Sequence, residues 1–139
     1  MNHQQRDDER AIRDLIEAWA AAVRRRDVAG ALENHSADIL MFDVPPPFKS
    51  EGIDAYRRTW DLFFSSSPDP VKFDIVEMRV TAGADVAFAA ALMQCTERDA
   101  SGEVIDLDFR LTVGLRKIDG RWVVTHEHHS IPSSPAPTS

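Results

Sequence analysis

The pair Asp119-Gly120 constrains the fold more than any other short feature of the sequence. It separates two segments rich in β-branched and apolar residues, 103–117 and 121–130. Glycine readily adopts the positive φ that a two-residue hairpin turn requires, so this pattern is the strongest short-range signal for a β-hairpin. We therefore expect antiparallel strands on both sides of the turn.

The strand after the turn ends in a cluster of titratable side chains. Strict alternation along this strand predicts that one face carries Trp122, Val124, His126 and His128. The opposite face would carry Val123, Thr125, Glu127 and His129. His126 and His128 would then reach one ligand together, whereas a slip of one residue would exchange His128 for Glu127 or His129. The sequence thus predicts a functional site here.

Two more strands are expected before this hairpin. Segments 72–81 and 85–98 alternate or are continuously apolar, and short turn-forming segments separate them from each other and from the strand at 103–117. Short turns predict an antiparallel meander. Residues 86–93 are apolar on both faces, which predicts a central strand covered by helices on one side and by a second subunit on the other.

The N-terminal half is predicted to be mainly helical. Apolar residues recur with helical spacing over 11–26, Asp27 is placed to cap a second helix through about residue 35, and Ser50 to cap a third over 51–64. A strand over 38–44 lies between the second and third helices and ends at three prolines.

Composition excludes several functional classes. With 139 residues the chain fits one domain, expected over 9–132, with disordered ends at 1–8 and 133–139. A formal net charge of -7 argues against partners that are nucleic acids or anionic membrane surfaces. We see no apolar segment long enough to span a bilayer and no secretory signal, so a cytoplasmic location is expected.

The order of these elements resembles a known superfamily. The hairpin Asp119-Gly120-Arg121-Trp122 and the closing His126-x-His128-x-Ser130 are similar to the SnoaL-like, ketosteroid isomerase-like branch of the nuclear transport factor 2-like superfamily, over about residues 8–132. The resemblance implies a cone-shaped α+β fold in which three N-terminal helices pack on a curved, mainly antiparallel sheet and enclose a pocket. It also implies a homodimer formed through the convex face of the sheet.

Members of this branch include isomerases, polyketide cyclases, dehydratases, epoxide hydrolases and non-catalytic association domains, so the fold alone assigns no chemistry. The resemblance places Asp43 where isomerase-like members keep their aspartate general base. Their oxyanion hole uses a first-helix tyrosine and a protonated late-strand aspartate. Trp19 and Gly114 occupy those positions here, so steroid isomerisation by that mechanism is not expected.

Our hypothesis is therefore an isomerase or lyase of the cyclase or dehydratase type, acting on a small apolar molecule that carries a carbonyl or hydroxyl group. Asp43 would be the base, His128 the partner acid with His126 beside it, and Arg110 would stabilise a developing oxyanion. The substrate-binding residues would be Trp19, Phe42, Tyr56, Trp60, Phe63, Phe88, Thr112 and Glu127.

Several alternatives remain open at this point. Arg110 shares a face with Thr112 and would either clamp a substrate carboxylate or form a structural ion pair. His126 and His128 would also suit zinc, but no third ligand stands at a characteristic spacing, so no metal or cofactor is predicted. The single cysteine, Cys95, is expected to be a buried hydrophobe. The whole chain would alternatively be a non-catalytic domain that binds a small acid or dimerises through its sheet.

Overall fold

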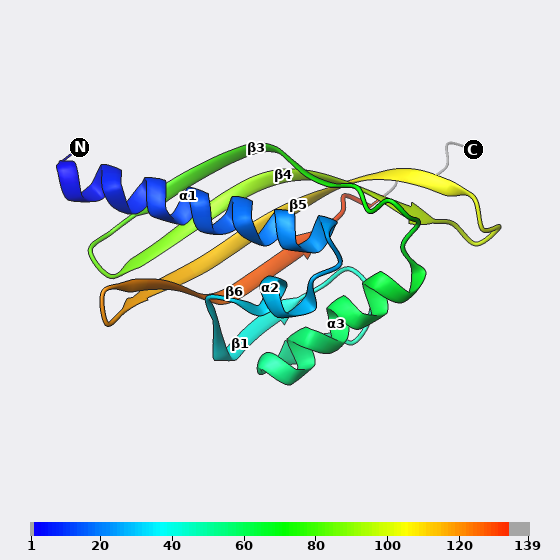
Figure 1. Cartoon of the computed structure of the whole chain (residues 1–139), viewed down its shortest axis with the longest axis horizontal. Coiled ribbons are helices and arrows are strands. Elements are labelled where there is room, and N and C mark those ends of the chain that lie inside the picture. Colours follow the sequence, from blue (N-terminus) through cyan, green and yellow to red (C-terminus); the bar gives the residue numbers. More distant parts are fainter. Residues whose placement is uncertain (1, 134–139) are drawn as a thin grey trace.

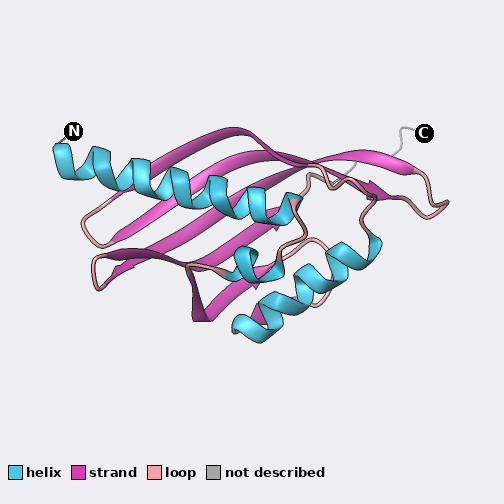
Figure 2. Cartoon of the chain, in the orientation of Figure 1, coloured by secondary structure: helices cyan, strands magenta, loops and turns pink. Residues whose placement is uncertain are grey.

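The computed structural model describes residues 2–133 as three helices and one sheet (Figures 1 and 2). The helices are α1 (His3–Arg24), α2 (Val28–Leu32) and α3 (Ile53–Ser66). The strands are β1 (His35–Phe42), β2 (Ser50–Glu51), β3 (Phe73–Ala82), β4 (Val86–Arg98), β5 (Val104–Ile118) and β6 (Arg121–Ser130). The predicted α+β class is confirmed, and the four C-terminal strands begin and end within two residues of their predicted bounds.

The six strands form one curved, open sheet in the order β2-β1-β6-β5-β4-β3 (Figure 1). All neighbours pair antiparallel except β1 and β6, which are parallel. This pairing brings the end of the first strand beside the histidine-rich end of the last: Met41 is opposite Glu127 and Phe42 opposite His128. The predicted meander is confirmed by the β3-β4-β5-β6 order.

The helix α1 lies along the sheet and extends further towards the N-terminus than the sequence predicted. It begins at His3, where the Asn2 side chain caps it by accepting a hydrogen bond from the Gln5 backbone N–H at 2.7 Å. Residues 3–8, which we expected to be disordered, are its first turns, and Asp8 is buried there. Residues 134–139 of the expected C-terminal tail lie outside the described part of the chain.

The two shorter helices follow the predicted order with different starts. Asp27 caps α2 as predicted, because its Oδ1 accepts the Gly30 N–H at 3.0 Å. Ser50 does not cap α3: it pairs with Met41 in the short strand β2, and Gly52 precedes the helix at a φ of 90°. The sequence missed β2 because a two-residue strand carries no periodicity.

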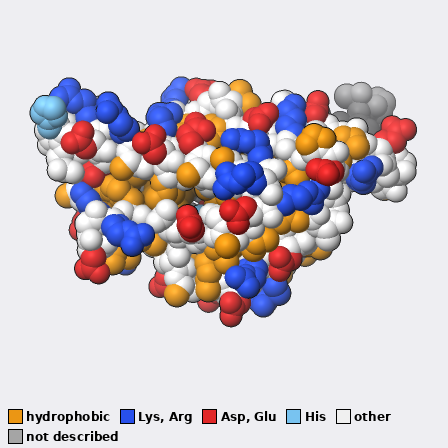
Figure 3. Space-filling view, in the orientation of Figure 1, with side chains coloured by type: hydrophobic (Ala, Val, Ile, Leu, Met, Phe, Trp, Pro, Cys, Tyr) orange, Lys and Arg blue, Asp and Glu red, His pale blue; other side chains and the backbone are white. Residues whose placement is uncertain are grey.

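The core lies between the helices and one face of the sheet. Its members include Ile12, Ile16 and Val23 of α1, Tyr56 and Trp60 of α3, and the inward residues of the strands, such as Ile39, Met41, Phe109 and Leu111. Seen from the helical side, acidic and basic side chains are mixed over the surface with apolar side chains between them (Figure 3). No helix among the described residues is both long and apolar enough to cross a membrane.

The outer face of the sheet has no helix over it and exposes apolar side chains. Val86, Phe88 and Leu92 of β4 are each about half exposed, with Phe88 at 52%. The continuously apolar segment 86–93 is therefore covered by the protein's own helices on one side only (Figure 1).

A β-bulge in β6 overturns the predicted faces of the last strand. Leu115 pairs with Val124 and Gly114 with His126, so Thr125 is an extra residue that has no partner in β5. An extra residue shifts the alternation that follows it. Trp122 and Val124 point into the core as predicted, but Glu127 and His129 follow them there, while His128 is exposed on the outer face.

Candidate functional site

A cavity of about 470 Å³ opens between α3, the end of β1 and the far ends of β4 and β5. Its walls are mostly apolar, and four aromatic residues contribute to them. The lining residues are Met41, Asp43, Val44, Pro45, Thr59, Trp60, Leu62, Phe63, Ser66, Phe73, Cys95, Glu97, Arg98, Leu107, Phe109, His129 and Ile131. The volume and the few polar groups among apolar walls are typical of a small-molecule site.

Two carboxylates border this cavity. Asp43 follows the last residue of β1, and its Oδ1 accepts the Val44 backbone N–H at 2.8 Å. Glu97 lies near the end of β4, where burial first and then the negative charge of Asp43 raise the pKa of its carboxyl above 4.5. Neighbouring like charges disfavour ionisation in this way. Asp43 also borders a second hollow of about 480 Å³, which contains Lys49 and Arg58.

Cys95 also lines the cavity, as a protonated thiol. Burial raises the pKa of this thiol to about 12, and the charges of nearby carboxylates add to the shift. Because the thiolate is the reactive form of cysteine, Cys95 is not placed to act as a nucleophile near neutral pH.

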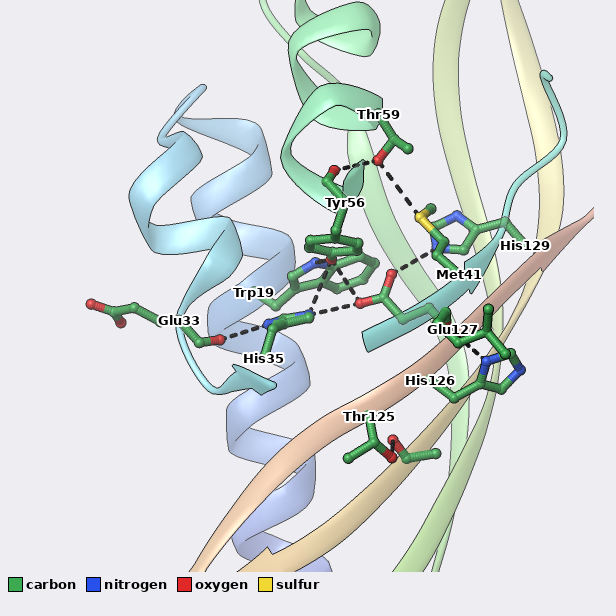
Figure 4. A network of polar contacts seen from close by, with 12 residues as sticks. Trp19, Glu33, His35, Met41, Tyr56, Thr59, Thr125, His126, Glu127 and His129 are labelled. Carbon is green, nitrogen blue, oxygen red and sulfur yellow. Dashed lines mark hydrogen bonds and ion pairs between the residues drawn. The ribbon is translucent and has the colours of Figure 1, made fainter. Parts of the chain in front are cut away.

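Behind the cavity, Glu127 is the centre of a buried polar network (Figure 4). Its Oε1 accepts the Tyr56 hydroxyl at 2.7 Å and lies 2.7 Å from His35 Nε2, and its Oε2 lies 3.1 Å from His129 Nε2. The Tyr56 oxygen in turn accepts Trp19 Nε1–H at 2.9 Å. Every side chain of the network is thus tied to a different element: α1, α3, β1 or β6.

This network fixes Glu127 as a carboxylate. Burial by itself would raise the pKa of Glu127, but hydrogen bonds from His129 and His35, with the charge interactions of both rings, lower it to about 2. The Tyr56 hydroxyl keeps its proton, because burial and then the Glu127 charge raise its pKa well above 10.0. A carboxylate can accept several hydrogen bonds and donates none.

The same contacts assign the protons on His35. Its Nδ1 lies 2.7 Å from the Glu33 carbonyl oxygen, which can only accept. Its Nε2 faces the Glu127 carboxylate and the Tyr56 oxygen, and the Tyr56 proton is already donated to Glu127. Both ring nitrogens therefore carry a proton, so the geometry assigns a buried His35 imidazolium paired with the Glu127 carboxylate.

His129 connects this network to the cavity. Its ring stacks on Phe109, with centroids 5.5 Å apart and planes 9° apart, and its Nε2–H donates to Glu127. Among residues 2–133, nothing hydrogen-bonds to its Nδ1. A carboxylate that accepts from one ring nitrogen fixes the tautomer, which leaves the other as an unprotonated acceptor. The cavity therefore has a neutral imidazole with a free basic nitrogen in its wall.

The other predicted site residues divide between the two faces of the sheet. Asp43, Trp60 and Phe63 line the cavity, while Trp19 and Tyr56 lie in the Glu127 network behind it. The outer face carries Arg110, Thr112, Phe88, Phe42, His126 and His128. Arg110 donates from Nε to the Ser130 hydroxyl at 3.1 Å, so it lies away from the cavity and from Asp43. His126 donates to the Leu40 carbonyl at 2.7 Å.

Sequence reasoning missed three residues of this site. Glu97 was not singled out, His129 was considered only as the result of a register slip, and His35 was set aside as the end of a helix. His35 is 92 positions from Glu127 in the chain, so only the parallel pairing of β1 with β6 brings them together. Within the described residues there is no group of three or more His, Cys, Asp or Glu side chains arranged to hold a metal ion.

An open curved sheet with helices over one face and a lined cavity between them defines a small α+β pocket protein. The sequence matches the SnoaL-like domain over residues 12–134, so the chain belongs to the SnoaL-like domain family. The resemblance noted in the sequence is thus confirmed. The comparison with curated proteins gave no match.

Solved structures agree with this assignment. An NTF2-like protein of unknown function from Pseudomonas putida KT2440 is 34% identical, with 94% of this chain and 90% of that chain covered and a TM-score of 0.83. A ketosteroid isomerase-like protein from Erwinia carotovora atroseptica SCRI1043 is 22% identical, with 91% and 98% covered and a TM-score of 0.77. The association domain of C. elegans CaMKII is 21% identical, with 94% and 100% covered and a TM-score of 0.73. The last two are similar in fold alone.

Proposed function

We propose that this protein is a small proton-transfer enzyme, an isomerase or lyase, that acts on a largely apolar molecule bearing a carbonyl or hydroxyl group. The observation that carries the proposal is His129: a buried imidazole in the wall of an apolar cavity, with one nitrogen held by a carboxylate and the other free. Such an arrangement suits general base catalysis, because the proton acceptor is held in one tautomer and one orientation.

In this proposal His129 Nδ1 removes a proton from the bound molecule, and Glu127 stabilises the imidazolium that forms. Asp43, on the same cavity wall, is the second group that moves a proton, returning it at another atom for isomerisation or to a leaving hydroxyl for elimination. Tyr56 and His35 are positioning residues, because they hold the Glu127 carboxylate and do not line the cavity.

This role replaces the one the sequence suggested for His128, which lies exposed on the opposite face of the sheet. The two histidines are neighbours in sequence, so they form a matched pair for experiment. We would follow turnover of a panel of small ketones, hydroxyketones and alcohols by proton NMR, with wild type and the variants His129→Gln, Asp43→Asn and His128→Gln.

The expected result is a loss of turnover of about 10²–10⁴-fold for His129→Gln and Asp43→Asn, which is the usual contribution of positioned acid–base groups. His128→Gln should retain wild-type turnover. Wild-type turnover in His129→Gln, or a loss confined to His128→Gln, would reject the proposed catalytic site.

A second candidate function is association of copies of the chain through the outer face of the sheet. The observation that favours it is the row of half-exposed Val86, Phe88 and Leu92, because contiguous exposed apolar side chains mark interaction surfaces. Association does not exclude catalysis, since the cavity opens on the other side of the sheet. The oligomeric state in solution tests it.

A further inference from the structure

The polar atoms that the cavity offers to a ligand are acceptors. His129 has 6% of its side chain exposed, and its free Nδ1 accepts rather than donates. Asp43 and Glu97 are carboxyl groups in the same wall. A ligand that satisfies these atoms must bring hydrogen-bond donors, because a buried acceptor left without a partner is unfavourable.

The donors that border the cavity are already used within the protein. The Thr59 hydroxyl donates to the Tyr56 carbonyl at 2.7 Å, and the Ser66 hydroxyl lies 3.3 Å from the Leu62 carbonyl. Arg98 donates from Nη1 to the Gly102 carbonyl at 3.0 Å, in the loop between β4 and β5. A carboxylate ligand would therefore find acceptors where it needs donors.

The charge of the wall has the same sign as this polarity. Asp43 and Glu97 interact strongly enough that, after burial, the Asp43 charge is the second cause of the raised pKa of Glu97. A positive charge placed between them would relieve that repulsion. Aromatic rings stand nearby, since Trp60, Phe63, Phe73 and Phe109 line the same cavity, and ring faces attract cations.

We propose that the molecule bound in this cavity is an amine: an aromatic or alicyclic body of a size that about 470 Å³ accommodates, carrying an ammonium group that lies against Glu97 and Asp43. The inference rests on the proposed function and names its substrate class. The ammonium binds at the carboxylate end, the apolar body lies against the rings, and His129 acts on the carbonyl or hydroxyl group of that body.

The test uses matched triads that differ only in the polar group: phenethylamine, phenethyl alcohol and phenylacetate, with the corresponding naphthyl series. Binding to the full chain is measured by calorimetry and thermal shift at neutral pH. We expect each amine to bind about tenfold or more tightly than its alcohol, and the acid to bind weakest.

Glu97→Gln is the diagnostic variant, and Asp108→Asn is its control. Asp108 is an exposed carboxylate on β5 that accepts from Gln94 at 2.8 Å and does not line the cavity. Both variants change the net charge equally, so a general attraction of amines to an acidic protein would affect both alike. Amine affinity should fall about tenfold in Glu97→Gln and stay unchanged in Asp108→Asn.

The outcomes separate this inference from the proposed function. Tighter binding of the acids or alcohols than of the amines would overturn the inference while leaving a ligand-binding cavity. Equal loss of amine affinity in both variants would also overturn it. If no member of any triad binds, and His129→Gln leaves turnover unchanged in the separate panel, the cavity itself is not the functional site and both proposals fail.

Discussion

Glu127 is a carboxylate buried in the core, and its charge is balanced by protein groups rather than by water. One oxygen faces Tyr56 and His35 and the other faces His129. Removing a charged partner from such a network leaves the remaining charge unpaired in a medium of low dielectric. The stability of the core and the orientation of His129 thus depend on the same side chain.

Glu127→Gln is therefore expected to lower the free energy of unfolding by about 3 kcal/mol or more, because the His35 imidazolium loses its counter-ion. Urea denaturation at neutral pH measures this change. Glu77→Gln, at an exposed position on β3, is the control and should differ from wild type by less than about 0.5 kcal/mol. Equal stability of the two variants would contradict the buried ion pair.

Acid titration of stability tests the same group in the wild type. The pKa of Glu127 is about 2 in the folded chain against an ordinary value of 4.5, so its contribution is complete above pH 4.5 and disappears as the pH falls towards 2. A shift of that size corresponds to about 3 kcal/mol. Unfolding free energy should decrease across this window in wild type and less steeply in Glu127→Gln; parallel curves would count against the assignment.

At this scale the sequence predicted some of the site's residues and placed others on the wrong face. Asp43 lies at the cavity because it ends an apolar strand face, which alternation makes visible. His128 and His129 exchanged faces because the extra residue Thr125 breaks the alternation before them. Nothing in the residues around Thr125 announces a bulge, since its cause is the pairing of β6 with its two neighbours.

The long helix α1 is tied to the far hairpin through one acidic side chain. Asp8 Oδ1 accepts from Lys117 Nζ at 3.0 Å, from Trp122 Nε1 at 3.1 Å and from Gln4 Nε2 at 3.2 Å. Burial opposes its charge, but the hydrogen bonds from Lys117 and Trp122 keep the pKa of Asp8 below 3.8. This contact fixes the start of the helix against β5 and β6.

Asp8→Ala should lower the free energy of unfolding by about 2 kcal/mol, because it leaves the buried Trp122 N–H without an acceptor. Asp7→Ala is a matched control, since Asp7 is the preceding residue and is exposed. Chemical denaturation of both variants compares them directly. If Asp7→Ala were as destabilising as Asp8→Ala, the helix dipole rather than the anchor would be the cause.

The elements themselves were predictable where a regular pattern covers many residues. The four C-terminal strands follow from alternation and from turns such as Asp119-Gly120, whose residues adopt positive φ of 51° and 78°. The first turns of α1 were missed because 3–8 contains no apolar period, and only the distant hairpin supplies a partner for Asp8. Pairing of β1 with β6 depends on contacts remote in sequence, which periodicity does not record.

The molecule as a whole has two differently specialised sheet faces. The inner face, under the helices, carries the cavity and the Glu127 network, and the outer face carries His126, His128 and a row of half-exposed apolar residues. A bulge in one strand decides which histidine belongs to which face. Chemistry on one side and association on the other are therefore compatible in a single domain.

Association through the outer face predicts a dimer in solution that a single charge disrupts. Phe88→Asp places a carboxylate in the middle of the apolar row on β4, whereas Arg79→Asp changes an exposed residue of β3 as a control. Size-exclusion chromatography with light scattering should show a dimer for wild type and the control, and a monomer for Phe88→Asp. A monomeric wild type would remove the second candidate function.

The protonation of His129 tests the central claim most directly, because the proposed chemistry requires a free basic nitrogen in the cavity wall. A proton–nitrogen correlation spectrum of the histidine rings at neutral pH reports each tautomer, with His129→Gln and His128→Gln used to assign the signals. We predict that His129 carries its proton on Nε2 and none on Nδ1, and that His35 is protonated on both nitrogens. A His129 ring protonated on Nδ1, or on both nitrogens, would contradict the account.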